Sequence, residues 1–256
     1  MRIALISDIH GNYTALEAVL ADIRQQPVDA LICLGDIATI GPQPKPVLDS
    51  LKASGCACIL GNHDAALFQL DAALEHQIAP PLIQTLHWCA RQLTAEDFAY
   101  LHACRPVIEL PLGADAALLC YHGSPQSNTD VILATTPAEE LDRLLTGRVA
   151  TVMAGGHSHI QMLRQHNGML VMNPGSVGNA FLKPPLPGAT PTLLPWAEYA
   201  LVNWVEGILS IDLRRVPFDI GAYIEVISQS DIPIRDWWLQ QYSSPASDSG
   251  SGNGSV

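Results

Sequence analysis

Short apolar runs alternate with amphipathic stretches in the first quarter of the chain. Residues 2–7, 29–36 and 56–64 are apolar runs that each end in polar side chains, which is typical of buried strands. Between them, residues 14–25 carry apolar side chains at helical spacing, and residues 44–53 predict a second, shorter helix. This β-α-β-α-β order predicts a parallel sheet covered by helices, with polar clusters at the carboxyl ends of its strands.

The remaining pattern predicts a helical region followed by further strands. Residues 65–103 are largely helical in pattern, and Asn12 and Thr94 are the predicted N-caps of two helices. Three further strands are predicted at 107–112, 116–122 and 149–159, with a helix at 137–146. Four short strands at 161–167, 169–173, 197–205 and 208–216 are predicted to form a second sheet. A helix at 219–229 and an aromatic segment at 234–242 are predicted to close the fold.

Two stretches lack the pattern of a packed core. Residues 183–195 are rich in proline and predict a surface loop, with a lid edge or a contact surface as alternatives. Residues 243–256 consist mostly of Ser and Gly and predict a flexible tail. We therefore expect a single domain over residues 1–242, followed by this tail.

The charge balance limits the classes of partner. The chain has 256 residues and a formal net charge of −12, and a surface this acidic disfavours binding of nucleic acids, whose phosphates require clustered Lys and Arg. Phosphate chemistry remains open, because bound metal ions can reverse the sign of the local field.

No apolar run reaches the length of about 18–20 residues that a membrane-spanning helix needs. The N-terminal strand meets polar residues too early for a secretory signal, and the six cysteines form no CxxC pair. We expect buried, reduced thiols in a cytoplasmic protein without membrane contact.

Candidate chemistry is concentrated in five short clusters, each next to glycine. In Asp8-Ile9-His10 the spacing of two puts both side chains on one side of an extended backbone, where they can reach one ion, and His157 and His159 repeat that spacing. The clusters are SDIHGN at 7–12, GD at 35–36, GNHD at 61–64, YHG at 121–123 and GHSH at 156–159.

These clusters combine imidazole and carboxylate donors without thiolate, which suits Mn, Fe, Co, Ni or Zn better than Ca or Mg. Asp36 offers a carboxylate able to bridge two cations, Asn62 offers an amide oxygen, and His122 offers a single imidazole. Two metals about 3.5–4 Å apart can share a hydroxide and hold the oxygens of a phosphoryl group. The clusters thus predict metal-dependent hydrolysis of phosphate esters.

In order and spacing, the clusters resemble the motifs D-x-H, GD, GNH[DE], H and GHxH of the calcineurin-like metallophosphoesterases. The stretch GDIATIGPQP at 35–44 and NPGS at 173–176 resemble the small bacterial and archaeal phosphodiesterase-type branch, although Ile40 stands where that branch often has Tyr. The resemblance implies an α/β fold in which two mixed β-sheets pack as a sandwich flanked by helices, a four-layer α/β/β/α arrangement.

The resemblance also implies a role for each residue of the clusters. His63 would be the catalytic imidazole near the leaving group, with Asp64 orienting it. The metal ligands would be Asp8, His10 and His159 for one ion, Asn62, His122 and His157 for the other, and Asp36 between them.

The function predicted from the sequence is hydrolysis of a small phosphate ester or nucleotide-like substrate by a metal-bridging hydroxide, with His63 assisting the leaving group. Mn is the first choice for the two divalent ions. The alternatives are a catalytically silent scaffold of the same fold, which an intact His63 disfavours, and a nuclease of the same superfamily, which the acidic surface disfavours. The adjacent Trp237 and Trp238 leave a homodimer open.

Overall fold

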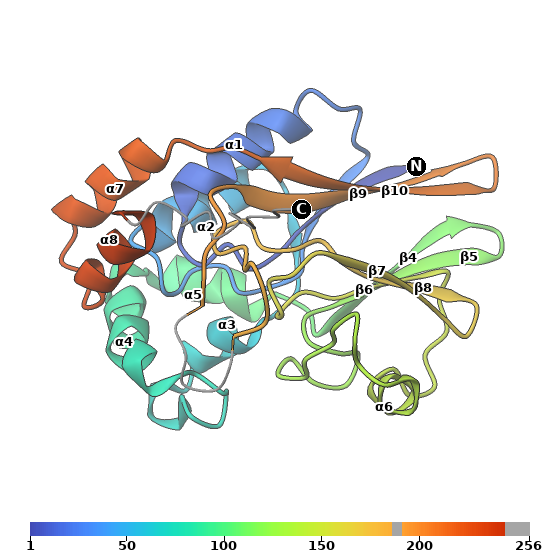
Figure 1. Cartoon of the computed structure of the whole chain (residues 1–256), viewed down its shortest axis with the longest axis horizontal. Helices are drawn as coiled ribbons and strands as arrows, with labels where there is room; N and C mark the ends of the chain where they lie inside the picture. The colour runs from blue at the N-terminus through green and yellow to red at the C-terminus, as the bar shows by residue number, and fades with distance from the viewer. Residues whose placement is uncertain (186–190, 244–256) are drawn as a thin grey trace, which may run out of the picture.

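The computed structural model describes residues 1–185 and 191–243. Two five-stranded sheets pack face to face, and helices cover their outer sides (Figure 1). This arrangement confirms the fold class that the sequence predicted.

The first sheet contains the three parallel strands predicted at the start of the chain, but it also takes up two later strands. The strands at 197–205 and 208–216, expected in a second sheet, return to the first one, where β9 pairs antiparallel with β1 and β10 with β9. In spatial order the sheet consists of β10 (Ile208–Val216), β9 (Ala197–Val205), β1 (Arg2–Ile6), β2 (Ala30–Cys33) and β3 (Ala57–Cys58).

Helices with one apolar face cover the outer side of this sheet. Two of them have the N-caps that the sequence predicted. Asn12 Oδ1 accepts from Ala15 N at 3.0 Å at the start of the helix Tyr13–Ile23, and Thr94 Oγ1 accepts from Asp97 N at 3.3 Å at the start of the helix Ala95–His102. The helices are α1 (Tyr13–Ile23), α2 (Pro44–Ala53), α4 (Ile83–Gln92) and α5 (Ala95–His102), with the short α3 (Asn62–Ala66) and the 3₁₀ turns η1 (Leu70–Ala72) and η2 (Pro80–Leu82) between them.

The second sheet mixes parallel and antiparallel pairs. Its central strands are parallel, and one antiparallel strand closes each edge. The spatial order is β4 (Val107–Gly113), β5 (Ala116–Tyr121), β6 (Val152–Ala154), β8 (Met169–Asn173) and β7 (Met162–His166), and α6 (Ala138–Leu144) packs on the outer face.

The inner faces of the two sheets form one apolar core. Leu5 and Ile32 of the first sheet meet Leu118 and Val152 of the second, and all four side chains are buried. Truncating one such leucine to alanine typically costs about 2–5 kcal/mol of stability. This core holds the strand ends of both sheets in fixed positions.

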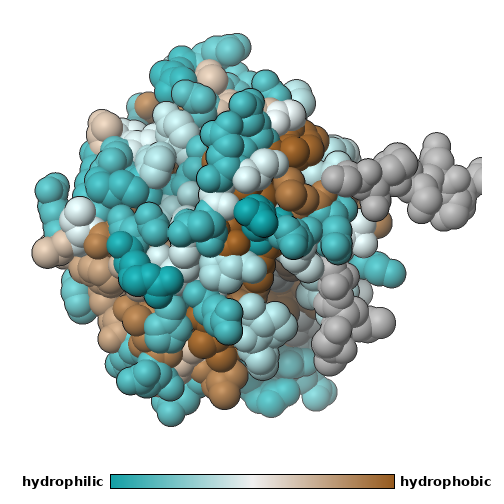
Figure 2. All heavy atoms as spheres, turned by 90° about the vertical axis from the view of Figure 1, so that its left-hand side faces the viewer, coloured by the Kyte–Doolittle hydropathy of each residue, from teal (hydrophilic) through white to brown (hydrophobic). Residues whose placement is uncertain are grey.

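The last two helices, α7 (Ile220–Gln229) and α8 (Arg235–Ser243), pack on the loop that follows β2. Trp238 is fully buried and donates from its indole Nε1 to the carbonyl of Ile40 at 3.2 Å. Figure 2 shows the side of the molecule where α4, α7 and α8 lie in Figure 1, with hydrophobic side chains in several groups between hydrophilic ones.

The six cysteines are all free, and five of them are buried. None of the described helices is long and apolar enough to cross a membrane. Of the predicted tail, residues 244–256 lie outside the described residues, as do residues 186–190 of the Pro-rich loop.

Candidate metal centre

The loops that follow β1, β2, β3, β5 and β6 meet at one edge of the sandwich and bring the predicted ligands together. In each of two groups, one potential ligand atom per residue lies within 4.8 Å of the others. Asn62 adds its amide oxygen, which lies 3.2 Å from His122 Nε2. The two groups are Asp8, His10 and His159, and Asp36, His122 and His157.

The backbone brings these side chains together in a way that the sequence did not predict. We expected Asp8 and His10 to share one side of an extended strand, but β1 ends at Ile6, and the two residues adopt φ values of 53° and 48°. His157 and His159 are also left-handed, at 64° and 59°.

Such φ values are unfavourable for residues other than glycine and cost about 1–3 kcal/mol each. They are concentrated here, since five of the nine non-glycine residues with positive φ in the described part of the chain are predicted ligands. The left-handed backbone at these positions, rather than the alternation of side chains along a strand, directs the predicted ligands toward a common centre. The five residues are Asp8, His10, Asp36, His157 and His159.

The donor set fits divalent cations, because buried carboxylate oxygens and imidazole nitrogens face one another at 3.3–3.7 Å. Asp8 is 0% exposed, and among the described residues its Oδ1 has no hydrogen-bond partner. The nearest basic atom is His159 Nε2 at 3.3 Å. A buried carboxylate oxygen without a donor is costly unless a cation lies beside it.

The orientation of the imidazoles supports the same conclusion. His122 Nδ1 lies 2.7 Å from the carbonyl of Leu34, and His159 Nδ1 lies 2.8 Å from that of Asn179. A carbonyl can only accept, so both rings carry their proton on Nδ1 when neutral. This leaves the Nε2 lone pairs free to point into the centre, as in metal sites whose histidines are held by backbone carbonyls.

The electrostatics of the centre favour positive charge. Burial opposes charge on His122, yet the carboxylate of Asp36 raises its pKa to about 9. Burial likewise disfavours the carboxylate of Asp8, and His159 nevertheless lowers its pKa to about 2. The field that raises the pKa of His122 would attract a metal cation equally.

Asp36 lies between the two groups. Its Oδ2 is 3.4 Å from His122 Nε2 in one group and 3.7 Å from His10 Nε2 in the other. Its Oδ1 accepts from the backbone N–H of His63 at 3.0 Å. This leaves Oδ2 as the oxygen of Asp36 that faces both groups.

Asp64, expected to orient His63, uses its carboxylate elsewhere. Oδ2 accepts from the N–H groups of Asp36 and Gly61 at 2.8 and 3.2 Å, and Oδ1 accepts from that of Ile37 at 2.9 Å. Asp64 therefore joins the start of α3 to the loop after β2, and it positions Asp36 rather than His63.

His63 projects from α3 beside the first group. Its ring lies edge-on to that of His10, with ring centroids 5.0 Å apart. Burial lowers the pKa of His63, and the negative charge of Asp36 opposes that shift. The imidazole thus stands next to the centre without belonging to either group.

Close packing at Gly61 supports the position of Asp36. A Cβ atom on Gly61 would lie 2.0 Å from Asp36 Oδ1, so only glycine fits at the start of α3. The glycine of the GNHD cluster is therefore needed for a close approach of the backbone to the carboxylate.

The NPGS stretch holds two of the loops in place. Ser176 Oγ donates to the carbonyl of Asp8 at 2.7 Å, and Asn173 Nδ2 donates to the carbonyl of Gly156 at 2.6 Å and to Ser158 Oγ at 3.0 Å. The side chains of this stretch thus fix the backbone at Asp8 and next to His157.

Two neighbours of the centre gave no recognisable signal in the sequence. Phe181 stacks on His159 with centroids 4.4 Å apart and an interplanar angle of 22°. Thr39 Oγ1 lies 3.4 Å from His10 Nδ1. Thr39 lies in the stretch at 35–44, where no feature set it apart from its neighbours, and Phe181 lies outside the five clusters and the NPGS stretch.

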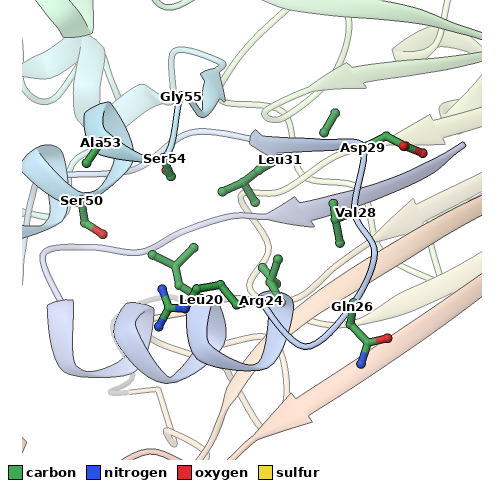
Figure 3. Close-up of a pocket in the computed structure, with 12 residues that line it drawn as sticks. Leu20, Arg24, Gln26, Val28, Asp29, Leu31, Ser50, Ala53, Ser54 and Gly55 are labelled. Carbon is green, nitrogen blue, oxygen red and sulfur yellow. The ribbon is translucent and has the colours of Figure 1, made fainter.

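A groove of about 600 Å³ lies at the opposite end of β2 and contains none of the predicted site residues (Figure 3). It runs between the ends of α1 and α2, and Leu20 and Leu31 point toward it. Its lining has no cluster of metal-binding side chains, so size alone does not identify the functional site.

Comparison with known proteins agrees with the geometry. A sequence model of the calcineurin-like phosphoesterase superfamily domain matches residues 1–192 and confirms the resemblance seen in the motifs. An uncharacterised protein of Methanocaldococcus jannaschii is 26% identical over 236 residues, which cover 90% of this chain and 93% of that protein.

A symmetrical bis(5'-nucleosyl)-tetraphosphatase of Hamiltonella defensa is 28% identical over 156 residues. The match covers 56% of this chain and 51% of that protein, so the chain matches only about half of the length of this relative.

Among solved structures, a metallophosphoesterase from Sphaerobacter thermophilus has a TM-score of 0.71 at 23% identity, covering 94% of this chain and 98% of that one. A protein from Pyrococcus horikoshii has a TM-score of 0.78 at 20% identity, covering 93% and 96%. At these identities the similarity demonstrates a shared fold.

Proposed function

The chain belongs to the calcineurin-like phosphoesterase superfamily, and from that premise we propose that it hydrolyses phosphate esters with two divalent metal ions. One ion would be held by Asp8, His10 and His159. The other would be held by Asn62, His122 and His157, with Asp36 shared between the two.

Bound ions would supply an activated water and positive charge for the oxygens of the phosphoryl group. The chain's own residues supply the rest. Asp64 and Ser176 fix the loops that carry Asp36 and Asp8, so the ligands are preorganised and need little rearrangement. Preorganised charge is the larger part of such catalysis.

His63 is the proposed proton donor to the leaving group. It lies beside His10 at the edge of the centre and retains some solvent exposure, which a group that exchanges protons with water requires. A positioned general acid contributes about 10²–10⁴ in rate.

The proposed substrates are small phosphate esters, including nucleotide-like ones, and Mn is the proposed metal. Support for a nucleotide comes from the symmetrical bis(5'-nucleosyl)-tetraphosphatases among the relatives. The donor set of nitrogen and oxygen without sulfur supports a metal such as Mn.

The observation that carries the proposal is that two groups of buried or nearly buried donors and the amide oxygen of Asn62 meet at one edge of the sandwich, and that within the described residues one of these donor atoms, Asp8 Oδ1, has no hydrogen-bond partner. The test is turnover of bis-p-nitrophenyl phosphate by the purified chain in Mn²⁺, with chelator-treated protein as the control. We expect activity that the chelator removes and Mn²⁺ restores. Absence of turnover in Mn, Fe, Co, Ni and Zn would favour a catalytically silent scaffold.

A further inference from the structure

A second cavity, of about 350 Å³, adjoins the metal centre and differs from it in chemistry. Its walls are mainly apolar and come from six separate segments of the chain. They include Ile40, Leu82, Phe181, Leu193 and Trp237.

The cavity shares a wall with the first group of predicted ligands. His159 lines it, and Phe181 stacks on the ring of His159 with an interplanar angle of 22°. A molecule whose phosphate lies at the metal centre would therefore extend past His159 into this apolar space. No Lys or Arg is among the described residues that line the cavity, so it suits an uncharged group rather than a second phosphate.

One polar atom in the wall has no partner. Asn179 is 5% exposed, and within the described residues its Oδ1 is buried without a hydrogen bond. Its backbone carbonyl holds His159, so the side chain has a fixed place at the junction of the cavity and the centre. The oxygen itself is covered by other atoms, so Asn179 contributes to the wall through its fixed position beside His159, and the chemistry of the cavity is set by its apolar and aromatic side chains.

The backbone of another wall residue is strained. Ile40 adopts φ 68°, which is unfavourable for a β-branched residue, and Trp238 donates to its carbonyl. Strain of this kind persists where surrounding structure enforces it and is concentrated at sites that bind ligands. Here the enforced turn keeps the side chain of Ile40 in the cavity wall.

We propose that this cavity binds the planar, uncharged organic group of the substrate, such as a nucleobase, while the phosphate lies at the metal centre. The inference rests on the proposed function and narrows its substrate class to esters with an aromatic group. Phe181 and Trp237 give the walls two aromatic side chains, and an apolar lining without Lys or Arg among the described residues suits a flat, uncharged ring.

The test compares two ligands that share a sugar phosphate and differ only in the base. Adenosine 5'-monophosphate and ribose 5-phosphate are titrated into the Mn²⁺-loaded chain by calorimetry, and chromatography checks that each ligand remains intact. We expect the nucleotide to bind about tenfold more tightly, the gain typical of one base stacked on aromatic side chains.

Trp237→Ala should remove most of this preference, and Trp237→Phe should retain it. Trp237 contacts none of the predicted metal ligands in a ring pair, whereas Phe181 does, so Trp237 is the cleaner position. The control is Trp204→Ala, because Trp204 lies at the other end of the first sheet, where β9 pairs with β10. We expect the preference for the nucleotide to survive in the control.

Equal affinities in the unmodified chain, no binding of either ligand, or equal losses for both ligands in Trp237→Ala would overturn the inference. The proposed function is judged separately by turnover of bis-p-nitrophenyl phosphate. A preference for the nucleotide without turnover would remove the proposed function and leave the base-binding cavity. Turnover without the preference would do the reverse.

Discussion

The two ends of the strands in the first sheet differ in almost every physical respect except that each carries a hollow. At the amino end of β2 the groove of Figure 3 is open and about 600 Å³ in volume, and residues such as Ala53, Ser54 and Gly55 on its rim are exposed. At the carboxyl ends the side chains of Asp8 and Asp36 are buried, with left-handed backbone at both.

The comparison shows that the free-energy cost of the local structure, rather than the volume of a hollow, marks the end of the sheet where the candidate site lies. Burying several carboxylates and imidazoles and holding five predicted ligands at positive φ has a high free-energy cost for the fold. Backbone-bound side chains such as Asp64 and Ser176 maintain this arrangement. A cation bound among these side chains would offset this free-energy cost.

The largest expected effect comes from Asp36→Asn, which removes the charge between the two groups while preserving shape. Changes in residues that only orient ligands lower metal affinity by about 10–100-fold, so loss of the shared ligand should exceed about 100-fold. Metal analysis of the purified variant should find both ions depleted, and turnover of bis-p-nitrophenyl phosphate should fall with them. Retention of two equivalents of metal would contradict the shared role of Asp36.

His63→Gln should separate catalysis from metal binding at the same end of the sheet. Because His63 belongs to neither group of ligands, metal content should stay near that of the unmodified chain. The turnover number should drop by about 10²–10⁴, the contribution of a general acid. If metal is lost in parallel with activity, His63 has been given the wrong role.

A matched pair of glycine substitutions probes the two ends directly. Gly61→Ala places a Cβ 2.0 Å from Asp36 Oδ1 and should cost about 1–3 kcal/mol of stability together with bound metal. Gly55→Ala, at the groove, meets nothing within 4 Å, although its φ of +62° costs about 1–2 kcal/mol for alanine. Urea unfolding and metal analysis should therefore show stability loss in both variants but metal loss in Gly61→Ala alone.

Equal metal content in the two glycine variants would mean that the close approach of Gly61 to Asp36 has no functional consequence. The pair is informative because both changes add one methyl group, and both are expected to cost stability. They differ in the source of that cost, which is a left-handed φ at Gly55 and the carboxylate of Asp36 at Gly61.

A smaller effect is expected at Asp97, a buried carboxylate that, unlike Asp8, has full partners. Oδ2 accepts from the N–H and the hydroxyl of Thr94, both at 2.8 Å, and Oδ1 accepts from Lys52 Nζ at 2.6 Å. Asp97→Asn should cost about 1–2 kcal/mol at pH 7 and leave metal content and turnover unchanged.

The same residue gives a pH dependence with a defined sign. Burial opposes the charge of Asp97, but hydrogen bonding from Lys52 and Thr94 lowers its pKa to about 2 from the ordinary 3.8. Because the pKa is lower in the folded state, its stabilisation is present above about pH 4 and is lost as the pH falls toward 2. Urea unfolding at pH 7 and pH 3 should show a smaller difference between the two pH values in Asp97→Asn; an equal difference would contradict this account.

The sequence predicted the fold class, most elements and the residues that meet at the strand ends, because apolar runs and polar clusters are local patterns. It predicted the wrong sheet for β9 and β10, because pairing with β1 is a contact between opposite ends of the chain. It also missed the left-handed turns at Asp8 and His10, which short-range spacing cannot distinguish from a strand.

The partners of the site residues were harder to predict for a related reason. His122 and His159 are oriented by backbone carbonyls, which every residue carries and no motif marks. Asp64 was expected to act on its neighbour in sequence, His63, but it binds the backbone of the loop after β2. Only the folded chain places these groups beside one another.

The central claim is that two cations lie at the carboxyl end of the strands, on either side of Asp36. Crystals grown with Mn²⁺ and measured at the manganese absorption edge test it most directly. The account predicts two anomalous peaks, one among Asp8, His10 and His159 and one among Asn62, His122 and His157, with Asp36 contacting both. A map with no peak at this edge, or with ions bound only elsewhere on the acidic surface, would contradict it.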